Sequence, residues 1–142
     1  NKDNRRWKRL EIGFFYSLVR CQRTTMKTRL LSDTKTAILE PIGAVSSLQD
    51  ALDFVSSGYG YNSNKILLRA EQLPPEFFEL QTCFAGEFIQ KLVNYRFYIA
   101  GVFGEVEVFS ESFREYVGEA RRGRQFRSFA TEDEAILWLE TQ

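Results

Sequence analysis

The sequence predicts an α/β domain in which helices pack on a small sheet, mostly parallel or mixed, that includes an N-terminal β-hairpin. Two short apolar runs, 66–68 and 97–103, are bounded by polar residues and rich in branched or aromatic side chains, as buried strands are. Between them, residues 84–93 have the 3.6-residue periodicity of an amphipathic helix. A strand, a helix and a second strand in this order predict a crossover that joins two parallel strands.

The helix between these strands is the best defined element of the sequence. Its apolar positions follow the i, i+4, i+8 spacing, and Glu87 and Lys91 form a favourably oriented i,i+4 pair on the opposite arc. We therefore expect the helix to bury Phe84, Phe88, Ile89 and Leu92. With 44% hydrophobic and 15% aromatic residues in 142, the chain can supply the core of one domain.

The elements before this unit begin with a predicted hairpin. Its strands are 28–31 and 36–39, joined by a polar turn, and Pro41 ends the second because it lacks a ladder donor. Ser47 and Asp50 have the spacing of a capping box that opens a helix, which we expect to end near Gly58. The glycine- and asparagine-rich residues 58–64, with Tyr59 and Tyr61, predict a loop before the strand 65–69.

The remaining elements alternate between helix and strand. Pro75 suits the first turn of a short helix, and Ser110 can cap a longer one that ends at Gly123. Residues 125–129 alternate as a strand does, and Thr131 with Glu134 predicts a capped final helix. The expected order is therefore β-β-α-β-α-β-α-β-α. Whether the helices cover one face of the sheet or both is left open.

Residues 1–25 differ in charge from the rest of the chain. They carry seven basic and two acidic residues, a net charge of +5, which leaves −5 for residues 26–142 because the whole chain is neutral. We interpret 26–142 as a single domain and 1–25 as a basic extension. The extension is either upstream of a true start at Met26 or a native segment that packs peripherally. Its basic head and apolar stretch imitate a signal peptide, but Glu11 interrupts the stretch.

The composition argues against several classes of function. The chain has no histidine, so the commonest general base and zinc ligand is missing. Cys21 and Cys83 are too far apart for a metal motif, and we expect Cys83 to be a buried, reduced thiol. No apolar run is long enough to span a membrane, and the acidic body does not favour nucleic acid. We therefore expect a cytoplasmic protein without catalytic residues, metal or cofactor.

Several segments of the body resemble a bacterial family, the domain of unknown function numbered 4180. The resemblance extends from about residue 28 to residue 139 and is carried most clearly by AGEFIQKLVNYR at 85–96. Further matching segments are SLQDALD at 47–53, PEFFELQT at 75–82, SFREY at 112–116 and GRQ at 123–125. The family has no assigned activity, so the resemblance implies the domain and not its function.

The order of elements is also similar to that of STAS domains, found in sulfate transporters and anti-sigma-factor antagonists. In those domains the helix after the third strand begins with a phosphorylatable serine or threonine, and this end docks on a partner. Thr82 is the matching position, but Gln81 replaces the acidic residue of the STAS motif and Cys83 and Phe84 replace its small residues. This departure puts phosphoregulation in doubt.

Two functions remain open. The first is a non-catalytic regulatory module that binds a protein partner or a second copy around Thr82, with Phe77 and Phe78 as aromatic anchors. The second is a small-ligand or anion binder, or an enzyme, that uses a crevice near Glu71, Thr82 and Glu105, with Asn94 in its lining. The missing histidine favours the first. Thr82 also has a plain structural role, because its hydroxyl can cap the helix that follows.

Overall fold

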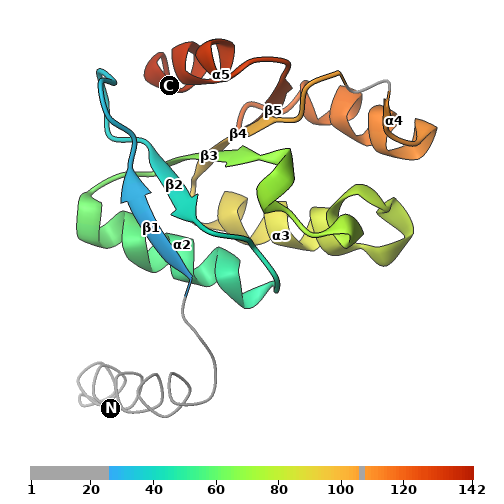
Figure 1. Ribbon diagram of the computed structural model, residues 1–142, viewed down its shortest axis with the longest axis horizontal. Helices are drawn as coiled ribbons and strands as arrows, with labels where there is room; N and C mark the ends of the chain where they lie inside the picture. The colour runs from blue at the N-terminus through green and yellow to red at the C-terminus, as the bar shows by residue number, and fades with distance from the viewer. Residues whose placement is uncertain (1–25, 106–107) are drawn as a thin grey trace.

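Five strands form one sheet and lie side by side in the order in which they occur along the chain. The computed structural model describes residues 26–105 and 108–142, so the predictions made for residues 1–25 lie outside the described residues (Figure 1). The strands are β1 (Lys27–Leu30), β2 (Leu39–Ile42), β3 (Lys65–Arg69), β4 (Tyr98–Val102) and β5 (Phe126–Phe129). Only β1 is antiparallel to its neighbour, and the pairs β2–β3, β3–β4 and β4–β5 are parallel.

Four α-helices and three short 3₁₀ segments connect or follow the strands. The helices are α2 (Gln49–Tyr61), α3 (Phe84–Asn94), α4 (Glu111–Ala120) and α5 (Glu132–Glu140). The 3₁₀ segments η1 (Ala70–Gln72), η2 (Pro75–Phe78) and η3 (Leu80–Thr82) follow one another between β3 and α3. The predicted α/β fold, with a hairpin and a mixed sheet, is confirmed.

Helices cover both faces of the sheet, which answers the question that the sequence left open. Figure 1 shows α2 and α3 on one side of the sheet and α5 on the other. The side chains follow the two-residue period of a strand: Ile66 and Leu68 pack with α2, α3 and α4, whereas Leu67 packs with α5. Residues of β3 are therefore buried on both faces, which explains why the strand reads as a continuous apolar run.

The larger core contains a cluster of phenylalanine rings centred on Phe77. This side chain is fully buried, and its ring lies 5.2–6.4 Å from five neighbouring rings. These rings belong to Phe78, Phe84, Phe88, Phe103 and Phe113. The cluster joins η2 to α3, α4 and the end of β4, and most of its contacts are edge-to-face, as aromatic pairs prefer.

Helix α3 buries the face that its sequence predicts. Phe88, Ile89 and Leu92 are buried, and Phe84 is half-buried against the same core. Cys83, immediately before the helix, is exposed and adopts a left-handed conformation with φ of 63°. The expectation of a buried Cys83 thiol was wrong, because the helix begins one residue later and its apolar face excludes position 83.

Helix α2 continues beyond the predicted end and includes Tyr59 and Tyr61 in its last turn. It stops at Asn62, which adopts the left-handed conformation with φ of 56°. Gly58 is needed inside the helix because a Cβ atom there would approach Phe97 Cζ to 2.6 Å. The glycine marks close packing between a helix and a neighbouring segment rather than a loop.

Two of the three predicted side-chain caps are formed as expected. Ser110 and Thr131 accept hydrogen bonds from the backbone amides of Phe113 and Glu134 and begin α4 and α5. At α2, by contrast, the Asp50 carboxylate accepts from the amide of Ser47, and Ser47 itself makes no cap. Half of that predicted capping box is present.

Candidate functional site

Thr82 is exposed and lies where η3 ends and α3 is about to begin. Its hydroxyl oxygen is 2.6 Å from the Glu76 carbonyl oxygen and 2.7 Å from that of Glu79, so it can donate to either. The same oxygen accepts a hydrogen bond of 3.2 Å from the amide of Phe84, the first residue of α3. Thr82 therefore joins η2, η3 and α3, and it satisfies one of the free amides at the helix start.

The two predicted aromatic anchors are not free to bind a partner. Phe77 is fully buried at the centre of the phenylalanine cluster, and Phe78 is half-buried with its ring stacked 4.7 Å from that of Phe109. The prediction of Phe77 as an exposed anchor was therefore wrong. The sequence shows only that the segment is apolar, and its fold turns the aromatic rings toward the core.

The proposed crevice is not assembled from the residues expected to line it. Glu71 and Glu105 follow β3 and β4 and are exposed at the carboxyl ends of these strands, as predicted. Asn94 is the last residue of α3, so it lies at the other end of the sheet, where its side chain accepts from Gln90 at 2.8 Å. It was wrongly assigned, because a crossover helix carries its last turn to the start of the next strand.

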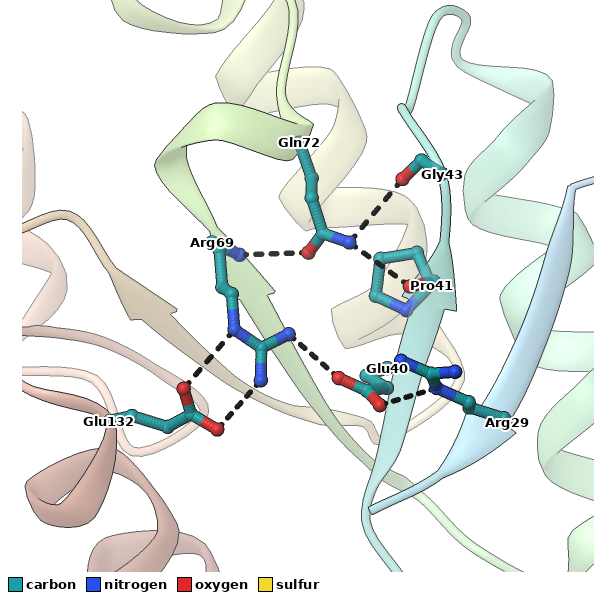
Figure 2. Close-up of polar contacts among 7 residues, drawn as sticks. All are labelled: Arg29, Glu40, Pro41, Gly43, Arg69, Gln72 and Glu132. Atoms are coloured by element: carbon teal, nitrogen blue, oxygen red, sulfur yellow. Dashed lines mark hydrogen bonds and ion pairs between the residues drawn. The ribbon is translucent and has the colours of Figure 1, made fainter.

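Side chains of the chain itself fill the region beyond the strand ends. Phe103, directly after β4, contacts Phe77 and Phe78 from η2. Beyond β2 and β3, the Gln72 side chain donates to the carbonyl oxygens of Pro41 at 3.0 Å and Gly43 at 3.4 Å (Figure 2). The described residues also contain no group of three acidic, cysteine or histidine side chains that could hold a metal ion.

An ion-pair network around the buried Glu40 side chain, which the sequence did not reveal, lies on the α5 face of the sheet. Arg69, at the end of β3, donates 2.7 Å hydrogen bonds to Glu40 from β2 and to Glu132 from the first turn of α5 (Figure 2). A second bond from Arg69 to Glu132, at 3.2 Å, makes that pair bidentate. Arg29 on β1 binds the other oxygen of Glu40 at 2.7 Å.

The environment of Glu40 favours its charged form. The side chain is only 8% exposed, and burial by itself raises the pKa of the carboxyl group. Hydrogen bonds from Arg29 and Arg69 act in the opposite direction, and the pKa of Glu40 lies below its ordinary value of 4.5. For Arg69, the hydrogen bond that it donates to Glu132 is the largest influence, and the pKa of the guanidinium is raised. These charges hold α5 to the sheet and leave no open coordination position.

The surface beside Thr82 contains a shallow hollow, which the sequence also did not predict. It has a volume of about 310 Å³ and lies between η3 and α4. Its lining residues are Leu80, Ser112, Glu115, Tyr116 and Glu119. We call this surface, together with Thr82, the η3–α4 surface. Burial raises the pKa of the Tyr116 hydroxyl, so it remains protonated at neutral pH.

Two carboxylates make the η3–α4 surface acidic. Glu115 and Glu119 are exposed and one helical turn apart, so their charges repel. Leu80 and the ring of Tyr116 supply the apolar part of the lining. Such a hollow suits a side chain with an apolar stem and a positive end, as arginine and lysine have. The i,i+4 pair of glutamates was visible in the sequence, but its position beside Leu80 depends on the fold.

The fold and these surfaces define a small α/β domain with an open, acidic surface hollow. Residues 32–139 match the DUF4180 family, described as a domain of unknown function. The chain belongs to this family. Neither the curated proteins nor the solved structures gave a match. In the described part of the chain, no helix is long and apolar enough to cross a membrane.

Proposed function

We propose that this domain is a non-catalytic, cytoplasmic regulatory module that binds a protein through the η3–α4 surface. The observation that carries the proposal is the hollow lined by Leu80, Tyr116 and two glutamates next to Thr82. The partner segment is one that presents a basic side chain with apolar neighbours, because this chemistry complements the lining.

Two further points support binding rather than catalysis. Asn94, expected in the crevice near Glu71 and Glu105, lies at the other end of the sheet, and the charges of Glu40 and Arg69 neutralise each other. The resemblance of the element order to STAS domains also supports docking near Thr82, since STAS domains bind partners at the start of the corresponding helix. Thr82 is exposed there, as a docking residue has to be.

The test uses a short probe peptide, Leu-Arg-Leu-Arg with blocked ends, titrated into the isotopically labelled protein. We expect saturable amide shifts at Leu80, Glu115, Tyr116 and Glu119, and at least a fivefold weaker affinity for the variant Glu115→Gln/Glu119→Gln. A peptide with glutamate in place of arginine is the control for charge. Glu71→Gln is the matched control variant and should bind normally.

The result that contradicts the proposal is equally clear. Shifts that centre on Glu71 and Glu105 would favour the crevice instead, and an absence of saturable shifts at millimolar peptide would remove the η3–α4 surface as a docking site. Thr82→Glu adds a charge and removes the contacts to η2, so its thermal unfolding has to be measured alongside binding. Unchanged binding by a folded Thr82→Glu protein would exclude Thr82 from the surface.

A further inference from the structure

Helix α4 presents a polar stripe on the side that faces away from the core. Glu111, Glu115 and Gly118 follow the spacing i, i+4, i+7 along α4, Arg122 lies in the turn directly after the helix, and all four residues are exposed. Phe113 is buried on the opposite side of the helix. This spacing is the one by which a helix presents a single line of residues to a second helix.

The charges on this stripe are divided between its two halves. Glu111 and Glu115 lie before Gly118, whereas Arg121 and Arg122 follow it. In the part of the chain that the structure describes, none of these four charged side chains forms an ion pair. The helix dipole accounts for acids in the first turn and bases in the last, but it does not account for Glu119 near the C-terminal end.

Gly118 separates the two halves, and nothing within the domain requires a glycine there. A Cβ atom at this position would meet no atom within 4 Å, and the residue lies inside a regular helix. Glycine in a helix interior is less favourable than alanine, and the separated domain has room for alanine at this position. The absence of a side chain allows a second backbone to approach α4 closely at this point.

We propose that the partner at the η3–α4 surface is a second copy of this chain, bound by antiparallel pairing of the two α4 helices about a two-fold axis near Gly118. The inference rests on the proposed function and names its partner. A two-fold axis at Gly118 places the acidic half of each stripe opposite the basic half of the other. Each Glu115 then faces Arg122 of the second copy, so that this ion pair forms twice in the dimer.

The same arrangement supplies an occupant for the hollow. Glu115 belongs both to the stripe and to the lining of the hollow. Arg122 of the second copy can lay its apolar stem against Leu80 and Tyr116, with its guanidinium between Glu115 and Glu119. The repulsion between these two glutamates is then relieved by a cation that the domain itself does not provide.

The contact in each copy consists only of helix α4 and the lining of the hollow. We therefore expect a weak dimer with a dissociation constant on the order of micromolar. Sedimentation equilibrium of the full chain should show a monomer–dimer transition that is weakened by raising the salt concentration. Glu115→Arg alone and Arg122→Glu alone should each weaken the dimer by at least about tenfold, because each creates two repelling pairs. Glu134→Arg, on α5, is the matched control and should not change it.

The decisive measurement mixes the two charge-reversed chains. In a two-fold dimer of Glu115→Arg with Arg122→Glu, both contacts pair opposite charges again, so a heterodimer should form although neither variant pairs with itself. The double variant Glu115→Arg/Arg122→Glu should likewise regain self-association. A head-to-tail contact would pair the same charges in the mixture, but it would not close after two copies and would continue into longer assemblies.

Gly118→Ala tests whether the backbones of the two α4 helices approach each other closely at this position. We expect it to raise the thermal stability of the separated domain and to weaken the dimer by about threefold or more. Unchanged self-association in this variant would overturn the placement of the two-fold axis.

The outcomes separate this inference from the proposed function. A chain that remains monomeric at all concentrations and salt conditions, yet binds the arginine peptide at the hollow, overturns the self-association and leaves protein docking in place. Loss of peptide binding as well would overturn both. Binding of a polyanion such as heparin through Arg121 and Arg122, without a dimer, would assign the basic half of the stripe to a different partner.

Discussion

The two faces of the sheet are held by different forces. The face covered by α2, α3 and α4 has a large, mainly apolar core, with Phe54, Phe77, Phe88 and Phe113 fully buried. The face covered by α5 has a small apolar cluster of Ile38, Leu67, Ala100, Ala135 and Leu139, and beside it the ions Glu40, Arg69 and Glu132. Buried apolar side chains stabilise the first face, whereas on the second face ion pairs help to attach the short helix α5 to the sheet.

This difference has a physical consequence for the order of unfolding. Burial of aromatic rings stabilises without regard to pH or salt, but an ion pair depends on the charge of both partners. A buried ion pair also gains little in net free energy because both ions lose water. We therefore expect α5 to be the part of the described fold whose attachment responds most to solution conditions, and the phenylalanine cluster to respond most to changes of volume.

The largest expected effect is on the phenylalanine cluster. Phe77→Ala should lower the free energy of unfolding by about 3–5 kcal/mol, because a fully buried ring leaves a cavity among five neighbouring rings. Denaturant titration followed by circular dichroism measures the loss. Phe78→Ala, at a half-buried position, is the matched control and should cost less. An equal loss of unfolding free energy in both variants would show that rings in the interior and at the rim of the cluster contribute equally to stability.

The next effect is on the ion-pair network. Arg69→Met keeps much of the side-chain volume but leaves Glu40 with a single partner, and we expect a loss of about 2 kcal/mol. Arg29→Met is the control: its side chain is 63% exposed, so the loss should stay below about 1 kcal/mol. Hydrogen exchange should locate the effect of Arg69→Met in α5. A loss spread evenly over α2 and α3 would contradict the separation of the two faces.

The smallest effect is on pH dependence. The pKa of Glu40 in the folded protein lies below its ordinary value of 4.5, so its contribution to stability is fully present well above pH 4.5. That contribution is lost as the pH falls below 4.5 through the pKa of the folded state. Unfolding midpoints between pH 7 and pH 3 should therefore fall less steeply for Glu40→Gln than for the wild type. Parallel curves would show that Glu40 does not carry a pH-dependent share of stability.

The local elements and their order could be predicted from the amino-acid sequence. Phe84, Phe88 and Leu92 follow the helical period over three turns, and β3 is a continuous apolar run, so local periodicity was sufficient to define both. The end of α2 was missed because Gly58 looks like a loop residue. A Cβ atom there would approach the Ser63 carbonyl oxygen to 2.5 Å and Phe97 Cζ to 2.6 Å, and the second of these contacts comes from a segment almost forty positions later in the chain.

Only the tertiary structure decided which side chains are free to act. Phe77 and Phe78 are adjacent and equally apolar in the sequence, yet the fold buries one ring completely and leaves the other at the rim. Glu40, Arg69 and Glu132 are 29 and 63 positions apart, so no periodicity could connect them. Local hydrogen bonding and side-chain period are encoded over a few residues, but contacts between ions and the placement of a surface hollow are set by how distant strands and helices pack.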